Sequence, residues 1–240
     1  MKARLRRLHS DQSGFTLPEL ITAMGIGLIV LLAAFMLLDR AVSGSTRIAD
    51  RQEAVQRGRL AMELITRQLR SEVCLGQAQP ILSGDDNSVT FYANLSSNPN
   101  AAQKRSLRYV TAEKRLYQDV YTGSGTFPNL TFPGTPTQSG ELIRPIVQTT
   151  EKVGSTTVTR PIFRYYKYAN ATTTGALQLL TTPLSATDAP DVVMINVAFA
   201  TLPQRLVERT TDVIDATTFD ANVYVRLADP TKPTEGPTCL

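Results

Sequence analysis

The sequence contains no tryptophan and only one histidine, His9, which precedes the first long apolar run. Beyond that run the chain therefore has no Ser-His-Asp triad, no Cys-His pair and no imidazole ligand for zinc. The commonest general base is also missing. The two cysteines, Cys74 and Cys239, are too few for a four-cysteine metal site. We therefore predict no catalytic residues, no bound metal and no cofactor.

The net positive charge is small once the N-terminal segment is set aside. Residues 1–14 carry four basic residues and one acidic residue, so they account for +3 of the formal net charge of +4. The sequence pI near 9.2 thus reflects a short leading segment. Basic residues beside a membrane span mark its cytoplasmic flank. We expect no nucleic-acid-binding surface.

Residues 15–38 form the longest apolar run, and residues 21–38 contain no charged side chain. As a helix these 24 residues measure about 36 Å, against about 30 Å for the hydrocarbon core of a bilayer. We expect this segment to span the bacterial cytoplasmic membrane once, with the N-terminus in the cytoplasm.

Residues 39–75 contain no proline and place apolar side chains at helical intervals. We predict one helix from about residue 15 to 75, about 90 Å long, with Gly76 as its stop. Two opposite-charge pairs at i,i+4 spacing support it by a few tenths of a kcal/mol each: Glu53 with Arg57, and Glu63 with Arg67. Its weak points are Gly44 and Gly58.

Residues 77–240 are rich in Thr, Val, Tyr and Phe and are interrupted by Pro and Gly. The segments 105–111 and 115–122 predict a hairpin, and 122–140 a turn-rich loop. Further strands are expected at 88–95, 142–150, 157–169, 176–182, 191–202 and 218–228. The fold class is α+β, with a long helix packed on a β-rich, mostly antiparallel head.

The stretch GFTLPEL, residues 14–20, places a proline and a glutamate at the start of the apolar run. A secretory signal peptide would have an apolar region of about 7–15 residues and a small-residue cleavage site. Residues 41–43 (Ala-Val-Ser) would serve as that site, but the run is too long and Glu19 interrupts its start. A plain membrane anchor explains the length but gives no reason for Glu19.

Residues 14–38 resemble the N-terminus of type IV prepilins, a family that includes the pseudopilins of type II secretion. The signature is a glycine before an aromatic residue, a glutamate fifth from that aromatic, and an apolar run of some twenty residues. The resemblance implies that a prepilin peptidase cleaves between Gly14 and Phe15 and N-methylates Phe15. Residues 1–14 would then be a leader, 15–76 the helix and 77–240 an extracytoplasmic head.

The chemistry of Glu19 and Pro18 fits this interpretation. A carboxylate at membrane depth is costly and needs a partner, and the resemblance implies that Glu19 meets the Phe15 amine of a neighbouring subunit. A glutamate that merely reaches the headgroups is the alternative. Pro18 would lose its hydrogen bond to residue 14, which cleavage removes, and is tolerated in a first turn. In the precursor it should push Leu17 out of helical angles.

Residues 57–73 resemble the larger minor pilins and the J-type pseudopilin of type II secretion. Many major pilins have proline where this chain has Met36, which favours a minor subunit. Tip subunits of pseudopili commonly lack the glutamate, so this chain is not expected at the tip. The predicted partners are prepilin peptidase, other pilin or pseudopilin subunits and the assembly platform. The alternatives are an anchored binding module that never polymerises and an anchored hydrolase.

Cys74 and Cys239 would sit in an oxidising compartment if the head is exported. A disulfide between them would close a loop of about 160 residues, which the chain-entropy treatment values at about 5 kcal/mol at most. Two unrelated thiols remain the alternative, because pairing cannot be deduced from sequence.

Overall fold

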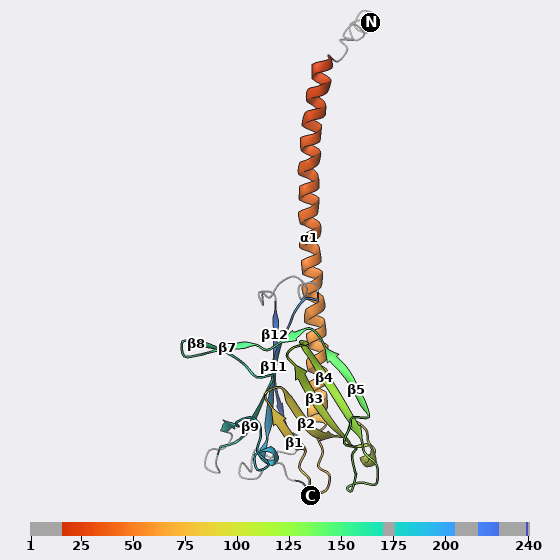
Figure 1. Ribbon diagram of the computed structural model, residues 1–240, viewed down its shortest axis with the longest axis vertical. Coiled ribbons are helices and arrows are strands. Elements are labelled where there is room, and N and C mark those ends of the chain that lie inside the picture. Colours follow the sequence, from red (N-terminus) through yellow and green to blue (C-terminus); the bar gives the residue numbers. More distant parts are fainter. Residues whose placement is uncertain (1–15, 170–175, 205–215, 226–238, 240) are drawn as a thin grey trace, which may run out of the picture. The chain divides into compact units, whose positions relative to one another are not determined.

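The structure is a computed structural model that describes residues 16–169, 176–204, 216–225 and 239. The chain forms two compact units that divide after Ala49. The first contains the apolar run, and the second contains the β-strands together with the remaining helical residues. Figure 1 shows the elements of both units.

Helix α1 (Leu17–Arg70) continues without a break through Met36, Gly44 and Gly58. The sequence prediction of one long helix is therefore confirmed. In the first unit its apolar side chains are exposed, and an 18-residue window reaches a mean hydropathy of 2.6. By length and composition this helix is able to cross a membrane.

The end of α1 lies about five residues earlier than the sequence suggested. After Arg70 the backbone turns to pair with the segment around residue 93: the N–H of Val73 donates to the Tyr92 carbonyl (3.1 Å), and that of Asn94 to the Ser71 carbonyl (2.9 Å). The N–H of Val73 and the carbonyl of Ser71 are thus used in strand pairing and are not available for the hydrogen bonds of a longer helix. Gly76, with a φ of 59°, belongs to a tight turn rather than to the helix stop.

Five antiparallel strands form the first sheet in sequence order. They are β1 (Ile81–Asp85), β2 (Ser88–Ala93), β3 (Gln103–Val110), β4 (Arg115–Thr122) and β5 (Gln138–Ile143), with a 3₁₀ turn at Pro99–Ala101. The β3–β4 hairpin is confirmed, with Lys114 at a positive φ of 54° in its turn. Val89, Phe91 and Ala93 alternate into the core, as the pattern indicated.

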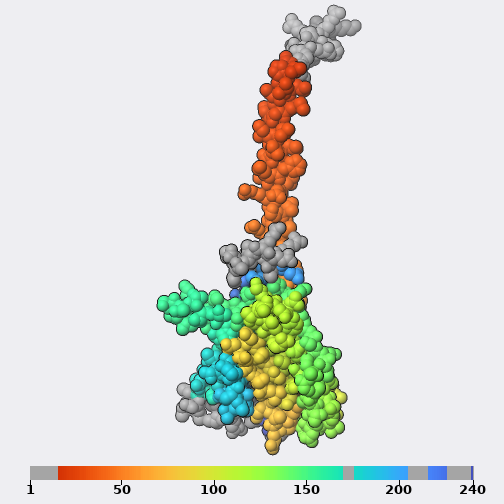
Figure 2. All heavy atoms as spheres, in the orientation of Figure 1, coloured from red at the N-terminus to blue at the C-terminus, as the bar shows by residue number. Residues whose placement is uncertain are grey.

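The second sheet has the order β10-β9-β11-β12, with β6 paired to β11. Strand β11 is buried along its whole length. A separate hairpin, β7–β8, stands out from the β-rich unit in Figure 2. The bounds are β6 (Ile146–Val147), β7 (Thr150–Val153), β8 (Thr156–Thr159), β9 (Phe163–Tyr168), β10 (Leu177–Leu179), β11 (Met194–Thr201) and β12 (Thr217–Tyr224), with a 3₁₀ turn at Ala189–Asp191.

Prolines break two strands that the sequence predicted as continuous. The segment 142–150 divides at Pro145, and 157–169 divides near Pro161. Proline has no N–H to donate to a strand ladder, so pairing stops beside it. The strands β1 and β7 were not expected, and β5 begins inside the segment predicted as loop.

One hydrophobic core joins both sheets to the second part of α1. The helix contributes Ala61, Ile65 and Leu69, each at most 3% exposed. The guanidinium of Arg57 donates to the carbonyls of Arg144 and Leu202 (3.2 Å for the latter), which fastens the helix to the loops of the β-rich unit. Residues 50–70 therefore belong to the core of this unit.

The two predicted charge pairs behave differently. Glu53 and Arg57 form an ion pair at 3.7 Å. Glu63 and Arg67 form none within the described chain, so that part of the sequence prediction was wrong. Gly58 is likewise no weak point, because the ring of Phe219 occupies the space where a side chain would be.

Candidate processing and assembly site

Pro18 and Glu19 occupy the first turn of α1. The carbonyl of Thr16 accepts hydrogen bonds from the N–H groups of Glu19 (3.0 Å) and Leu20 (3.1 Å), which places Thr16 at the cap of the helix. Pro18 is therefore the second helical residue, where its missing N–H costs nothing. The helix tolerates the proline because of this position.

Leu17 belongs to the helix even though it precedes a proline. The prediction that Pro18 keeps Leu17 out of helical angles in the precursor was wrong. The helix nevertheless starts only one residue before Pro18, since an earlier start would require the hydrogen bond that proline cannot donate. Gly14 and Phe15, the predicted cleavage pair, lie outside the described residues.

The Glu19 carboxylate is exposed, and it has no hydrogen-bond or ion-pair partner among the described residues. An acidic residue in a first turn interacts favourably with the positive end of the helix dipole. That interaction is worth about 0.3–1 kcal/mol at an exposed site, far less than the cost of a charge at membrane depth. Its carboxylate is thus available to a partner from outside the chain.

Cys74 and Cys239 lie together in the structure, with their Cα atoms 5.5 Å apart and their sulfurs joined in a disulfide. The two residues are separated by 165 positions in the sequence. The bond ties the C-terminus to the segment that directly follows α1.

The apolar helix and its first turn were compared with known proteins. The family model described as the prokaryotic N-terminal methylation motif matches residues 9–35. This match supports a type IV prepilin-like protein. The match includes Gly14 and Phe15 as well as Pro18 and Glu19, so all four predicted residues fall within the family's N-terminal motif. No match was found among curated proteins, and none among solved structures.

Proteins with this motif are structural subunits. The motif implies that the prepilin-like protein is processed by a prepilin peptidase and assembles with pilin subunits. Together with the exposed apolar helix, it supports membrane anchoring.

Sequence reasoning did not single out Glu72, which follows α1 directly. Its side chain is buried, with 3% of the residue exposed, and neither carboxylate oxygen has a hydrogen-bond partner in the described chain. Burial raises the pKa of Glu72 well above its usual range. In the sequence Glu72 falls where a continued helix would place a polar, exposed residue. It is buried because the backbone turns after Arg70 and pairs with the segment around residue 93.

Proposed function

We propose that the chain is a minor pilin-like subunit of a type IV pilus or a related filament. A prepilin peptidase would remove residues 1–14 and N-methylate Phe15. The apolar part of α1 would first anchor the subunit in the cytoplasmic membrane and then pack inside the filament. The β-rich unit would lie outside the membrane, as a head on the filament surface.

Glu19 carries this proposal. It is an exposed carboxylate in the first turn of an apolar helix, it has no partner among the described residues, and it lies within the matched N-terminal methylation motif. In the membrane such a group needs a counter-charge. The amine that cleavage creates on Phe15 of an adjacent subunit supplies that charge. Assembly would thus pair the costly Glu19 carboxylate with a specific cation.

Replacing Glu19 tests the proposal. Glu19→Ala should abolish filaments while the protein stays processed and membrane-bound, as seen by electron microscopy of surface filaments and by immunoblotting of membranes. Glu53→Ala on the same helix is the matched control, because Glu53 forms only an exposed ion pair. Normal filaments with Glu19→Ala would instead favour an anchored module that does not polymerise.

The J-type pseudopilin of type II secretion is the second candidate. The run 57–73 that resembles it supplies the helix residues of the head core, Ala61, Ile65 and Leu69. Deletion of the gene separates the two roles: loss of pili with normal protein secretion supports the minor pilin, and loss of secretion with normal pili supports the pseudopilin.

A further inference from the structure

A groove with a volume of about 650 Å³ runs along one stripe of α1 in the β-rich unit. The helix lines it from Arg59 to Arg70, and residues 71–73, Asn94 and Phe219 of β12 complete the lining. The stripe covers about 16 Å at 1.5 Å per residue, which matches about five residues of extended chain. The groove is therefore sized for a short peptide segment.

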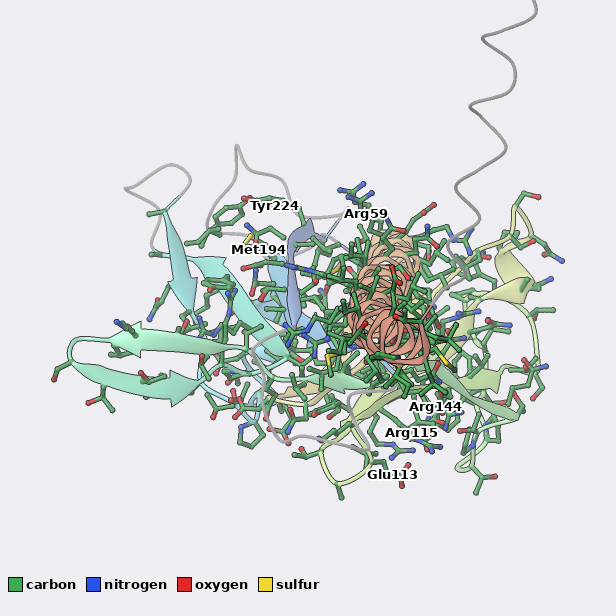
Figure 3. All side chains as sticks on the ribbon, turned by 90° about the horizontal axis from the view of Figure 1, so that it is seen from above. Arg59, Glu113, Arg115, Arg144, Met194 and Tyr224 are labelled. Atoms are coloured by element: carbon green, nitrogen blue, oxygen red, sulfur yellow. A yellow bond between two sulfur atoms is a disulfide. The ribbon has the colours of Figure 1, made fainter. Side chains whose placement is uncertain are left out.

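Three arginines line this groove, and none has a counter-ion among the described residues. Arg59, Arg67 and Arg70 make no side-chain hydrogen bond or ion pair within the described chain. In Figure 3, Arg59 projects from α1 on the side opposite to Arg115 and Arg144, which do form ion pairs with Glu141. Arg67 and Arg70 suit the negative end of the helix dipole, but that role does not account for Arg59.

The positive charge extends into the neighbouring sheet. Arg105 of β3 is buried, and both desolvation and the charge of Arg67 lower its pKa. Glu63 is the one exposed acid on the groove wall, and it does not pair with Arg67. Among the described residues, positive charge therefore exceeds negative charge around the groove.

Glu72 adds a hydrogen-bond donor to the lining of the groove. The side chain is buried, lines the groove and lacks a partner in the described chain. Burial raises the pKa of this carboxyl group and so favours its neutral form over the carboxylate. A neutral carboxylic acid donates through its O–H, so it favours an oxygen acceptor such as a carboxylate.

We propose that this groove binds an acidic peptide segment of a partner protein, whose carboxylates pair with the guanidinium groups of Arg59, Arg67 and Arg70. Arginine binds carboxylates through two parallel hydrogen bonds, which gives the contact its geometry. Glu72 donates to an oxygen acceptor of the same segment. In a filament the partner is an adjacent subunit, a step that rests on the proposed function.

A single-stranded nucleic acid fits the groove less well. Such strands bind through a basic track together with aromatic rings on which bases stack. Phe219 is the one aromatic side chain on the described wall, so successive bases would lack rings to stack on.

Fluorescence anisotropy with the purified full-length chain in detergent micelles tests the proposal. The probe is a labelled hexaglutamate peptide, with hexalysine and hexathymidylate as comparison probes. We expect hexaglutamate to bind most tightly. Arg67→Ala and Arg70→Ala should each weaken it by at least about fivefold. Arg51→Ala, an exposed helix arginine outside the groove, should leave its Kd unchanged.

Variants of Glu72 test the donor. Glu72→Gln keeps an N–H donor and should retain binding, whereas Glu72→Leu should weaken it by at least about fivefold. Wild-type binding should weaken as the pH rises and Glu72 loses its proton, and the Gln variant should not respond. Thermal melting establishes that each variant is folded.

Three results would overturn the proposal: equal loss of binding with Arg51→Ala, tighter binding of hexathymidylate than of hexaglutamate, or equal binding by the Gln and Leu variants. These outcomes are independent of filament assembly. A protein that binds the peptide but forms no filament refutes the proposed function alone.

Discussion

At Gly58, helix α1 and strand β12 approach more closely than any side chain would allow. A Cβ built on this glycine would lie 2.1 Å from Cε2 of Phe219, whose ring stacks on Phe199 at 5.6 Å. The residue that the sequence marked as a weak point of the helix is therefore the one that lets the helix dock. Its helix-propensity cost of about 1 kcal/mol relative to alanine is outweighed by this packing.

Gly58→Ala should destabilise the β-rich unit by about 1–3 kcal/mol, because the ring of Phe219 must move. Chemical denaturation followed by circular dichroism measures the change. Gly44→Ala is the control, since no atom lies within 4 Å of its added Cβ and alanine favours the helix. A Gly58→Ala protein as stable as wild type would show that the contact is loose.

Glu72→Gln should raise stability near neutral pH by about 1–3 kcal/mol, because an amide is uncharged, whereas burying Glu72 requires it either to be desolvated as a carboxylate or to bind a proton. Burial raises the pKa of Glu72 in the folded state, so the folded protein holds the proton more tightly than the unfolded chain. Stability is thus highest below the unfolded pKa of about 4.3 and falls as the pH rises through the folded value.

Thermal melting across this range checks the prediction. The gap between the Gln variant and wild type should open as the pH rises above about 4.3 and should close at lower pH. A gap that does not depend on pH would contradict it.

At the scale of elements, the disulfide between Cys74 and Cys239 joins the end of the chain to the end of α1. Because it closes a loop of 165 positions, its loss should lower the free energy of unfolding by up to about 5 kcal/mol. Denaturation with and without reductant, beside a double Cys→Ser variant that reductant should not affect, measures this. Non-reducing mass spectrometry that finds both thiols free would remove the assignment.

Pro18 sets the start of α1, and this start bears on processing. Pro18→Ala would restore an N–H donor for the carbonyl of Gly14, so the helix can extend toward the predicted scissile bond. Cleavage of the precursor should slow, while the span itself stays helical. Time courses of leader removal with purified prepilin peptidase test this, and unchanged kinetics would contradict it.

The elements that the sequence predicted correctly are those with a local signal. Alternation identified β2 and the β3–β4 hairpin, and helical spacing identified α1. Strand β1, with Ser, Gly and Asp among its five residues, has no such pattern and is held by pairing with β2. The strand breaks near Pro145 and Pro161 follow from the missing N–H of proline, although the sequence prediction treated both segments as continuous strands.

The candidate sites divide in the same way. Gly14, Phe15, Pro18 and Glu19 are contiguous, so their chemistry could be inferred from spacing alone. The groove could not be inferred, because Glu72 becomes buried only when the chain pairs with the segment after β2 and Phe219 comes from β12. Its parts are separated by more than a hundred positions and meet only through tertiary packing.

At the scale of the whole molecule, the chain joins a membrane-competent helix to a β-rich unit with its own core. The apolar side chains of the first unit are exposed within the single chain. Such a surface needs either lipid or the helices of other subunits to cover it. The proposed function supplies both, first the membrane and then the filament.

The most direct test of this account is the intact mass of the protein after coexpression with a prepilin peptidase. The account predicts a chain that begins at Phe15 and carries one methyl group on its amine, and an unprocessed chain when Gly14 is replaced. A chain cut after Ser43, or one that keeps residues 1–14 in the presence of active peptidase, would contradict it.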